Sequence, residues 1–207
     1  MLKCRRRWFA VLLLPFALLA QDLKPVALPK PRIEGGKPLM QALKLRKSTR
    51  GFSQEKLSWQ TLSDLLWAAW GVNRPDGRRT APSAMNSREI DVYVVLPDGA
   101  YLYEAEPHRL SPVAPVDASA KPDSALHLVL VEDQARFQYA QAAPESKISF
   151  AGFAAGAISQ NVYLFCASEG LATVVRASIG KPELTRLLRL RPDQRVLYVQ
   201  AVGYPAR

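Results

Sequence analysis

The chain has 207 residues, of which 48% are hydrophobic and 22% are charged, and these proportions suit one globular domain with a sizeable core. They exclude an intrinsically disordered chain, which would be poorer in apolar residues. The net charge is +10, but residues 1–20 hold four basic side chains and no acid, so the remainder carries 24 basic and 18 acidic side chains. Because these charges are spread without a basic block, we expect no nucleic-acid partner and assign the excess to the surface and to a site for an anionic group.

The first 20 residues resemble a signal peptide. A basic stretch that ends at residues 5–7 precedes an apolar run over 8–20, which is shorter than the ~20 apolar residues of a membrane-spanning helix. Ala20 offers a small side chain for cleavage, so we expect a secreted or periplasmic protein, with an uncleaved membrane anchor as the alternative. Residues 6–9, Arg-Arg-Trp-Phe, also resemble a twin-arginine export signal, though loosely.

The first half of the remaining chain predicts a linker, two helices and a loop. Residues 21–38 contain four prolines and predict an extended linker before a domain over 39–207. A first helix is expected over 39–47. The clearest helix spans 58–70, because Ser58 is a natural N-cap, apolar residues recur at helical spacing, and Gly71 ends it. Residues 73–87 have no helical or strand period and predict a loop.

Strands dominate the middle of the chain. Residues 90–96 alternate as a strand does, and Pro97-Asp98-Gly99 predicts a turn into a partner strand over 101–103. The apolar run 126–131 predicts a further strand.

The last third mixes helices with one strand. Residues 150–168 are apolar on nearly every side, which predicts a buried helix at a subunit interface, where Gly152 and Gly156 would let another backbone approach. A short helix over 182–190 and a strand over 195–202 follow. Because helices and strands do not alternate regularly, the fold class is α+β.

Cysteine and histidine are scarce. Cys166 is the single cysteine after residue 20, so no intramolecular disulfide can form there. We expect a buried, inert thiol rather than a nucleophile, and the neighbouring Gln160 and Asn161 should be buried amides. With only His108 and His127 besides, the sequence does not indicate a metal site, and we predict none.

The densest group of potential anion ligands is the run Arg46-Lys47-Ser48-Thr49-Arg50, at the end of the first predicted helix. Two guanidiniums, an ammonium and a hydroxyl are good hydrogen-bond donors for a phosphate. On position alone, the alternative is a solvated helix end whose cations complement the helix dipole.

Two later segments carry weaker signals when each is read alone. Residues 82–87, Pro-Ser-Ala-Met-Asn-Ser, form a turn-prone polar run before the strand at 90–96. Glu169-Gly170 ends the long apolar helix, where a glycine supplies a left-handed cap and permits close approach of the backbone to a ligand.

In this order, the three segments resemble those of the nitroreductase family, whose members bind FMN between two subunits, and most closely those of its SagB-type dehydrogenase branch. The resemblance covers roughly residues 39–205. It implies a nitroreductase-like fold, with a central mixed or antiparallel sheet flanked by helices, in a homodimer with FMN as cofactor.

The same resemblance implies a role for the basic run. Arg46, Ser48 and Arg50 would hold the phosphate and ribityl chain of FMN, and Lys47 would contribute from its backbone or side chain.

It also implies roles for the two later segments. Pro82, Ser83 and Asn86 would pack on the flavin of the partner subunit, with the Asn86 amide at the polar edge of the ring. The junction Glu169-Gly170 would present a backbone amide to flavin N5, which accepts hydride. We predict no catalytic side chain, because the flavin carries the chemistry.

The implied activity is that of an FMN-dependent oxidoreductase with ping-pong kinetics. NAD(P)H, a quinone or a membrane redox partner would donate hydride, and a small molecule would accept it; the oxidative direction of the azoline-dehydrogenase branch is equally open. The alternative is a non-catalytic flavin-binding or accessory module on the same fold. A plain secreted interaction domain would leave the basic run and residues 82–86 unexplained.

Overall fold

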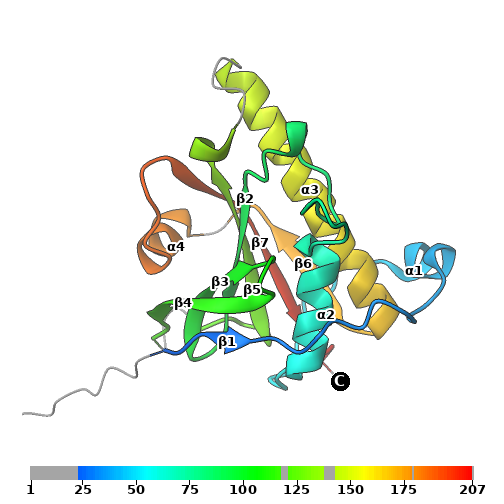
Figure 1. The fold of residues 1–207 in the computed structure, drawn as a ribbon. Coiled ribbons are helices and arrows are strands. Elements are labelled where there is room, and N and C mark those ends of the chain that lie inside the picture. Colours follow the sequence, from blue (N-terminus) through cyan, green and yellow to red (C-terminus); the bar gives the residue numbers. More distant parts are fainter. Residues whose placement is uncertain (1–22, 118–120, 138–142, 179, 207) are drawn as a thin grey trace, which may run out of the picture.

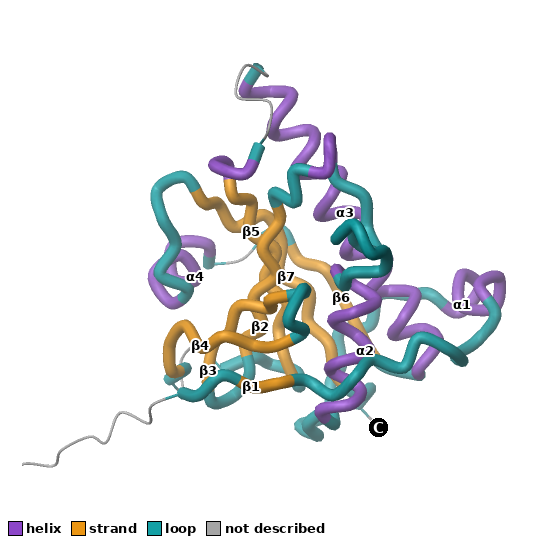
Figure 2. Tube along the Cα trace, viewed as in Figure 1, coloured by secondary structure: helices purple, strands orange, loops and turns teal. Residues whose placement is uncertain are grey.

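The computed structural model describes residues 23–117, 121–137, 143–178 and 180–206, so the predicted signal peptide lies outside the described residues. These residues form an α+β fold, in which one antiparallel sheet has helices on both faces (Figure 1, Figure 2). The strands are β1 (Val26–Ala27), β2 (Ile90–Val95), β3 (Gly99–Glu104), β4 (Arg109–Pro115), β5 (Leu126–Asp133), β6 (Ala172–Arg176) and β7 (Gln194–Gly203). The helices are α1 (Leu39–Leu45), α2 (Trp59–Trp70), α3 (Pro144–Glu169) and α4 (Lys181–Leu187), with short 3-10 turns η1 (Ala84–Asn86) and η2 (Gln134–Arg136).

The sheet has the strand order β1-β4-β3-β2-β5-β7-β6, and each neighbouring pair is antiparallel. The predicted α+β class and central sheet are therefore confirmed. The strands expected at 90–96, 101–103, 126–131 and 195–202 are present as β2, β3, β5 and β7. Sequence reasoning missed β4, which contains two prolines and lies beside the two-residue edge strand β1, where a missing N–H costs little.

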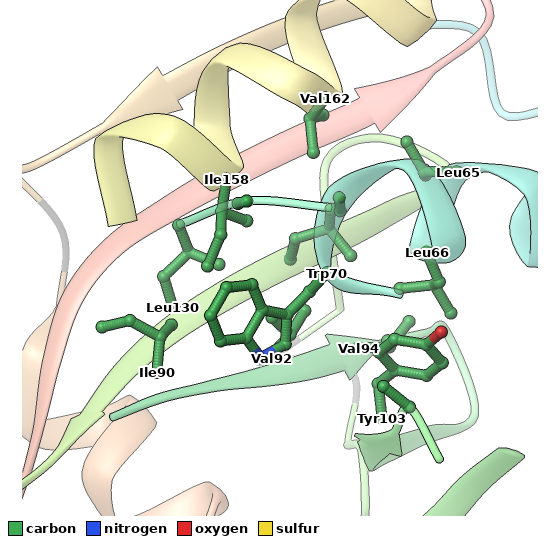
Figure 3. Packing of buried hydrophobic residues seen from close by; sticks show 14 of the residues in the cluster. Leu65, Leu66, Trp70, Ile90, Val92, Val94, Tyr103, Leu130, Ile158 and Val162 are labelled. Carbon is green, nitrogen blue, oxygen red and sulfur yellow. The ribbon is translucent and has the colours of Figure 1, made fainter. Parts of the chain in front are cut away.

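The main core lies between the sheet and the pair α2 and α3. The Ser58 side chain caps α2 by accepting a hydrogen bond from the Thr61 N–H at 3.0 Å. Figure 3 shows how side chains of both helices meet those of β2 and β5. The buried residues labelled there include Leu65, Leu66 and Trp70 from α2, Ile158 and Val162 from α3, and Ile90, Val92, Val94 and Leu130 from the sheet. A smaller cluster with Leu188 covers the opposite face below α4.

The segment expected to be a free linker belongs to the folded domain. Its described part is extended, as predicted, but Val26 pairs with Leu110 of β4. Further along, the Arg32 guanidinium lies 2.8 Å from the Asp64 carboxylate on α2. The prolines that suggested a spacer are compatible with an edge strand and an extended surface segment, because neither needs every backbone N–H. The described part of this segment, residues 23–38, is thus extended and also packs against the domain.

A hydrogen-bonded chain holds this segment to the core through His108. Ser63 Oγ donates to the Pro29 carbonyl at 2.6 Å, so its oxygen can accept from His108 Nε2, 2.7 Å away. The Tyr103 hydroxyl lies 2.9 Å from His108 Nδ1 and can donate to it. Both bonds are satisfied by a neutral imidazole that carries its proton on Nε2. Burial lowers the pKa of His108, against smaller opposing effects of Pro29 and Asp64.

This pKa shift predicts a loss of stability in mild acid. Because the folded pKa of His108 lies below its ordinary value of 6.5, the unfolded chain binds more protons in that window, and the free energy of unfolding falls as the pH drops below about 6.5. In His108→Gln, whose amide can both donate and accept, the fall from pH 7 to pH 5 should be shallower. Urea denaturation at several pH values measures this. Burial also lowers the pKa of His127, but His127 is present in both the wild type and the variant. If the free energy of unfolding fell equally with pH in the two proteins, the assignment of the effect to His108 would be wrong.

The long helix α3 is buried on one side only. Eight of its residues are buried against the sheet and its neighbours, the pattern of a core helix, although α3 is also long and apolar enough to cross a membrane by length and composition. On the other side Phe153 is 62% exposed. A Cβ at Gly152 or Gly156 would meet nothing within 4 Å. Gln160 is exposed in the single chain, so the expected burial of its amide against backbone or cross-subunit groups stays a prediction.

Candidate functional site

The basic run Arg46–Arg50 lies next to the C-terminal end of α3 and the edge strand β6. Helix α1 ends at Leu45, two residues before the predicted end, and the Arg46 N–H still donates to the Ala42 carbonyl. The Thr49 N–H then donates to the Thr173 carbonyl of β6 at 2.9 Å. These two bonds fix the path of the run between a helix end and a strand.

The run borders a cleft of about 290 Å³. The cleft is lined by Lys47 and Thr49 from the run, by Tyr163 and Gly170 from α3 and its cap, and by Thr173 from β6, among others. The structure therefore brings two of the predicted site residues, Lys47 and Gly170, to one cavity.

Tyr163 connects the other members of the run to this cleft. Its hydroxyl accepts a hydrogen bond from the Val175 N–H at 3.0 Å and lies 2.8 Å from Ser48 Oγ. Because the Tyr163 oxygen already accepts one hydrogen bond, its own hydrogen can go to Ser48, which leaves the Ser48 hydroxyl free to donate to a ligand. The Arg46 guanidinium lies 5.2 Å from the Tyr163 ring centroid, within cation–π range.

Sequence reasoning missed Tyr163. The available signal was its position in α3, seven residues and so about two turns before Gly170, on the same side of the helix. A tyrosine with its apolar ring buried needs a partner for its hydroxyl, and Ser48 meets that need.

The electrostatics of the run suit an anion. Within the described part of the chain, Arg46, Lys47 and Arg50 form no ion pair with a carboxylate. Lys47 lines the cleft, and Arg46 lies against the ring of Tyr163, which also lines it. A phosphate in the cleft would supply the negative charge that these cations lack. The donor set therefore fits the phosphate of FMN, whereas a solvated helix end would not require the Ser48–Tyr163 contact.

The end of α3 has the predicted left-handed glycine, with Gly170 at φ 73° and ψ 22°. Its amide, however, donates to the Cys166 carbonyl, and the Leu171 N–H donates to the same oxygen at 2.9 Å. Neither amide is thus free in this chain to face a flavin, although two donors that share one acceptor are each held less strongly than a single one. The predicted contact to N5 stays a prediction.

Residues 36–37, just before α1, contact the C-terminal end of α3. The Lys37 N–H donates to Ser168 Oγ at 2.8 Å, and the Lys37 ammonium donates to the Ser168 carbonyl. Gly36 has φ +75°, and a Cβ there would lie 2.7 Å from Ser168 Oγ, so glycine is required. Lys37 also lines the cleft. The Glu169 carboxylate instead accepts from Ser168 Oγ and lines a different pocket, on the side of Gly36.

The segment Pro82–Asn86 does not reach this cleft within one chain. Met85, Asn86 and Arg88 all have positive φ, between 53° and 55°, which is strained for residues with a side chain. Ser83 stabilises the loop by accepting from the Arg88 N–H at 2.9 Å. The Asn86 carboxamide makes no hydrogen bond to the rest of the described chain. The structure does not test the role predicted for this segment, a contact with the partner's flavin.

Two further side chains, the thiol of Cys166 and the guanidinium of Arg176, are explained by their surroundings in the fold. Cys166 is fully buried, and burial raises the pKa of its thiol, as expected for an inert side chain. Arg176 forms two hydrogen bonds with the exposed Asp123, at 2.8 and 3.1 Å. Among residues 23–117, 121–137, 143–178 and 180–206, no group of three His, Cys, Asp or Glu side chains could hold a metal ion.

Comparison with known families matches residues 43–204 to the nitroreductase family, which is most of the chain. The chain belongs to the nitroreductase family. A crystal structure from Ralstonia eutropha, described as that of a nitroreductase, is 38% identical, with a TM-score of 0.84 over 91% of this chain and 93% of that one. A protein of Methanocaldococcus jannaschii whose name places it among the nitroreductases is 28% identical over 163 residues, or 70% of this chain and 81% of its own length.

The fold also occurs in a flavin enzyme of known cofactor use. The NADPH:FMN oxidoreductase of Vibrio harveyi, solved with NAD+, has a TM-score of 0.59 over 82% of this chain and 69% of its own. At 17% identity this likeness concerns the fold alone. The comparisons therefore establish the family without a choice among its branches.

Proposed function

We propose that this protein is an FMN-dependent oxidoreductase that passes hydride from a reduced donor to a small-molecule acceptor in two half-reactions. The observation that carries the proposal is the pair of cations without a carboxylate partner in the described chain, Arg46 and Lys47, beside the Ser48–Tyr163 contact at the cleft. The nitroreductase membership supports FMN as the ligand, and the residues matched to the family, 43–204, include this group.

Each residue has a defined part in binding. Arg46 and Arg50 neutralise the phosphate, and Lys47, on the cleft wall, adds a third positive charge. Ser48 donates its hydroxyl hydrogen to a phosphate oxygen while it accepts from Tyr163. When bound, FMN supplies the hydride-accepting atom N5. The protein then binds and orients the ring beside the end of α3, with no side chain as acid or base.

We further propose a homodimer whose interface includes the exposed faces of α1 and α3. Leu39 and Met40 on α1 are 63% and 76% exposed, and Phe153 on α3 is 62% exposed. Exposed apolar side chains in such numbers mark an association surface. In this dimer the segment Pro82–Asn86 of one subunit would contact the flavin bound by the other, with the Asn86 carboxamide at its polar edge.

Donor, acceptor and location are part of the same proposal. NAD(P)H is the expected donor, as the name of the Vibrio harveyi enzyme supports for that protein. If residues 1–20 direct export, a quinone or membrane redox partner replaces it, because nicotinamides are scarce outside the cytoplasm. In the oxidative direction of the SagB-type branch, the same site would take hydride from the small-molecule substrate instead of giving hydride to it.

One observation favours a second candidate, a flavin-binding module without turnover. The Gly170 and Leu171 amides both donate to Cys166 within the helix end. If they keep these bonds with FMN bound, no amide tunes N5.

An absorption titration of residues 21–207 with FMN tests the proposal, with riboflavin as the matched ligand that lacks the phosphate. We expect saturable binding of FMN and at least about 100-fold weaker binding of riboflavin, because two charge-assisted contacts are lost. Anaerobic addition of NADPH or a reduced quinol should then bleach the bound flavin, and an acceptor should restore it. Equal affinities for the two ligands would contradict the phosphate site, and flavin that binds without turning over would identify the accessory module.

A further inference from the structure

A second cavity shares no lining residue with the cleft beside the basic run. Its volume is about 470 Å³, and its walls come from the end of α2, from β2 and β3, and from the turn before β4. Apolar surface comes from Trp70, Val92, Leu102 and Pro107, whereas Arg79, Arg88 and Arg136 bring positive charge. A concave site with apolar walls and a few convergent charges is the usual form of a small-molecule pocket.

Arg79 is the feature of this cavity that needs an explanation. Its side chain is only 12% exposed, and its Nε and Nη1 atoms are buried with no hydrogen-bond partner. The nearest carboxylate oxygen, Oε1 of Glu106, is 3.9 Å from Nη2, beyond hydrogen-bond distance. The guanidinium lies 5.8 Å from the Trp70 ring centroid. A buried guanidinium without a matched acceptor is costly, so proteins usually pair it.

The backbone holds Arg79 in this position. Arg79 forms an isolated β-bridge with Val72, and its carbonyl accepts from Arg74 Nη2 at 2.9 Å. The Thr80 N–H donates to the Gly71 carbonyl at the end of α2. The backbone at Arg79 is therefore fixed before any ligand arrives, and burial restricts its side chain, which together lower the entropy cost of binding.

The carboxylates of the cavity are largely committed to other cations. Asp91 Oδ1 lies 2.8 Å from Arg136 Nη1, and Glu104 Oε2 lies 2.8 Å from Arg109 Nε. Neither can compensate Arg79 without giving up its own partner.

Glu106 is shared and exposed. Its side chain is 63% exposed, and its Oε1 lies 3.1 Å from Arg88 Nη1, closer than to Arg79. Burial lowers the pKa of Arg79, Glu106 partly offsets this, and the Arg88 charge adds to it. The three arginines and three carboxylates that line the cavity therefore balance in formal charge, but Arg79 alone among these arginines has no carboxylate oxygen within hydrogen-bond distance.

We propose that this cavity binds a small organic carboxylate, with the anionic group between Arg79 and Arg88 and the body against the apolar wall. A monoanion suits the site better than a phosphate dianion, because Asp91, Glu104 and Glu106 also face the cavity and repel a second negative charge. The Nη2 atom of Arg79, unlike its buried Nε and Nη1, can donate a charge-assisted hydrogen bond to a carboxylate oxygen in the cavity.

Calorimetric titration of the purified chain with sodium benzoate tests this site, with benzamide as the neutral ligand of the same shape. We expect saturable binding of benzoate and at least about tenfold weaker binding of benzamide, since one charge-assisted contact is worth about that much. Arg79→Met should bind benzoate at least about tenfold more weakly than the wild type does. Arg78→Met is the matched control, because Arg78 is the adjacent residue, is 56% exposed and pairs with Asp76; it should bind as the wild type does.

Two further readouts separate a ligand site from a structural role. Arg79→Met should unfold at the same or a higher temperature than the wild type without ligand, because it removes a poorly compensated buried charge. If that variant does not fold, Glu106→Gln keeps the proposal testable: removal of the competing, exposed carboxylate should tighten benzoate binding severalfold. Equal binding of benzoate and benzamide, benzoate affinity unchanged in Arg79→Met, or weaker binding in Glu106→Gln would overturn the proposal.

Discussion

Replacing Arg46 and Arg50 together by alanine should reduce the affinity for FMN at least about 100-fold. Each guanidinium is proposed to make a charge-assisted contact with the phosphate, and such contacts contribute about 1.5–3 kcal/mol each. The apo domain should remain folded, because neither side chain forms an ion pair in the described structure and Arg46 contributes only its contact with the Tyr163 ring, worth about 0.5–1 kcal/mol at an exposed site. Flavin absorption and fluorescence titrations measure the affinity, and thermal unfolding measures the fold.

Lys44→Ala is the matched control for this pair. Lys44 lies in the last turn of α1, is exposed and does not line the cleft. Its substitution also removes a positive charge from this part of the chain. Its FMN affinity should stay within about threefold of that of the wild type, since a single distant surface charge is screened by salt. If the double variant bound FMN as the control does, the phosphate assignment would be wrong, while the family and fold would stand.

The fold could be predicted where sequence period and burial coincide. In α2 the N-cap, the apolar stripe and the terminal glycine follow one another in the sequence. The strands β2 and β5 are rich in apolar residues because both faces of the sheet are covered there. The strands β1, β4 and β6 lack such a signal. β1 has two residues, and β4 carries prolines that normally argue against a strand. Their pairing depends on residues distant in the sequence.

The candidate site could be predicted in part. The basic run and Gly170 carry local signals, and the structure places Lys47 and Gly170 on one cleft. Tyr163 and Lys37 could not be predicted as neighbours of that run, because their contacts to Ser48 and Ser168 span 115 and 131 residues. The hydrogen bonds of the Gly170 amide likewise depend on how α3 ends, which composition does not determine.

Gly156→Leu should convert the proposed dimer to a monomer. Gly156 is exposed on α3, and a Cβ there meets nothing within 4 Å in this chain. The substitution therefore costs the monomer no packing and should favour the helix by about 0.8–1 kcal/mol. At a helix-to-helix interface, however, a leucine would separate the two backbones, which would weaken the apolar contacts around Phe153. Analytical ultracentrifugation measures the association, and thermal unfolding at low protein concentration measures the monomer.

Arg186→Leu on α4 is the matched control, because it also adds an exposed leucine to a helix, on the opposite face of the sheet (Figure 1). The control should stay dimeric. If Gly156→Leu remained a dimer with unchanged FMN affinity, this face of α3 would not be the interface. If it became a monomer that still bound FMN as tightly, the segment Pro82–Asn86 would not supply contacts to the partner's flavin. Loss of both properties together is the outcome expected of a flavin site completed across the interface.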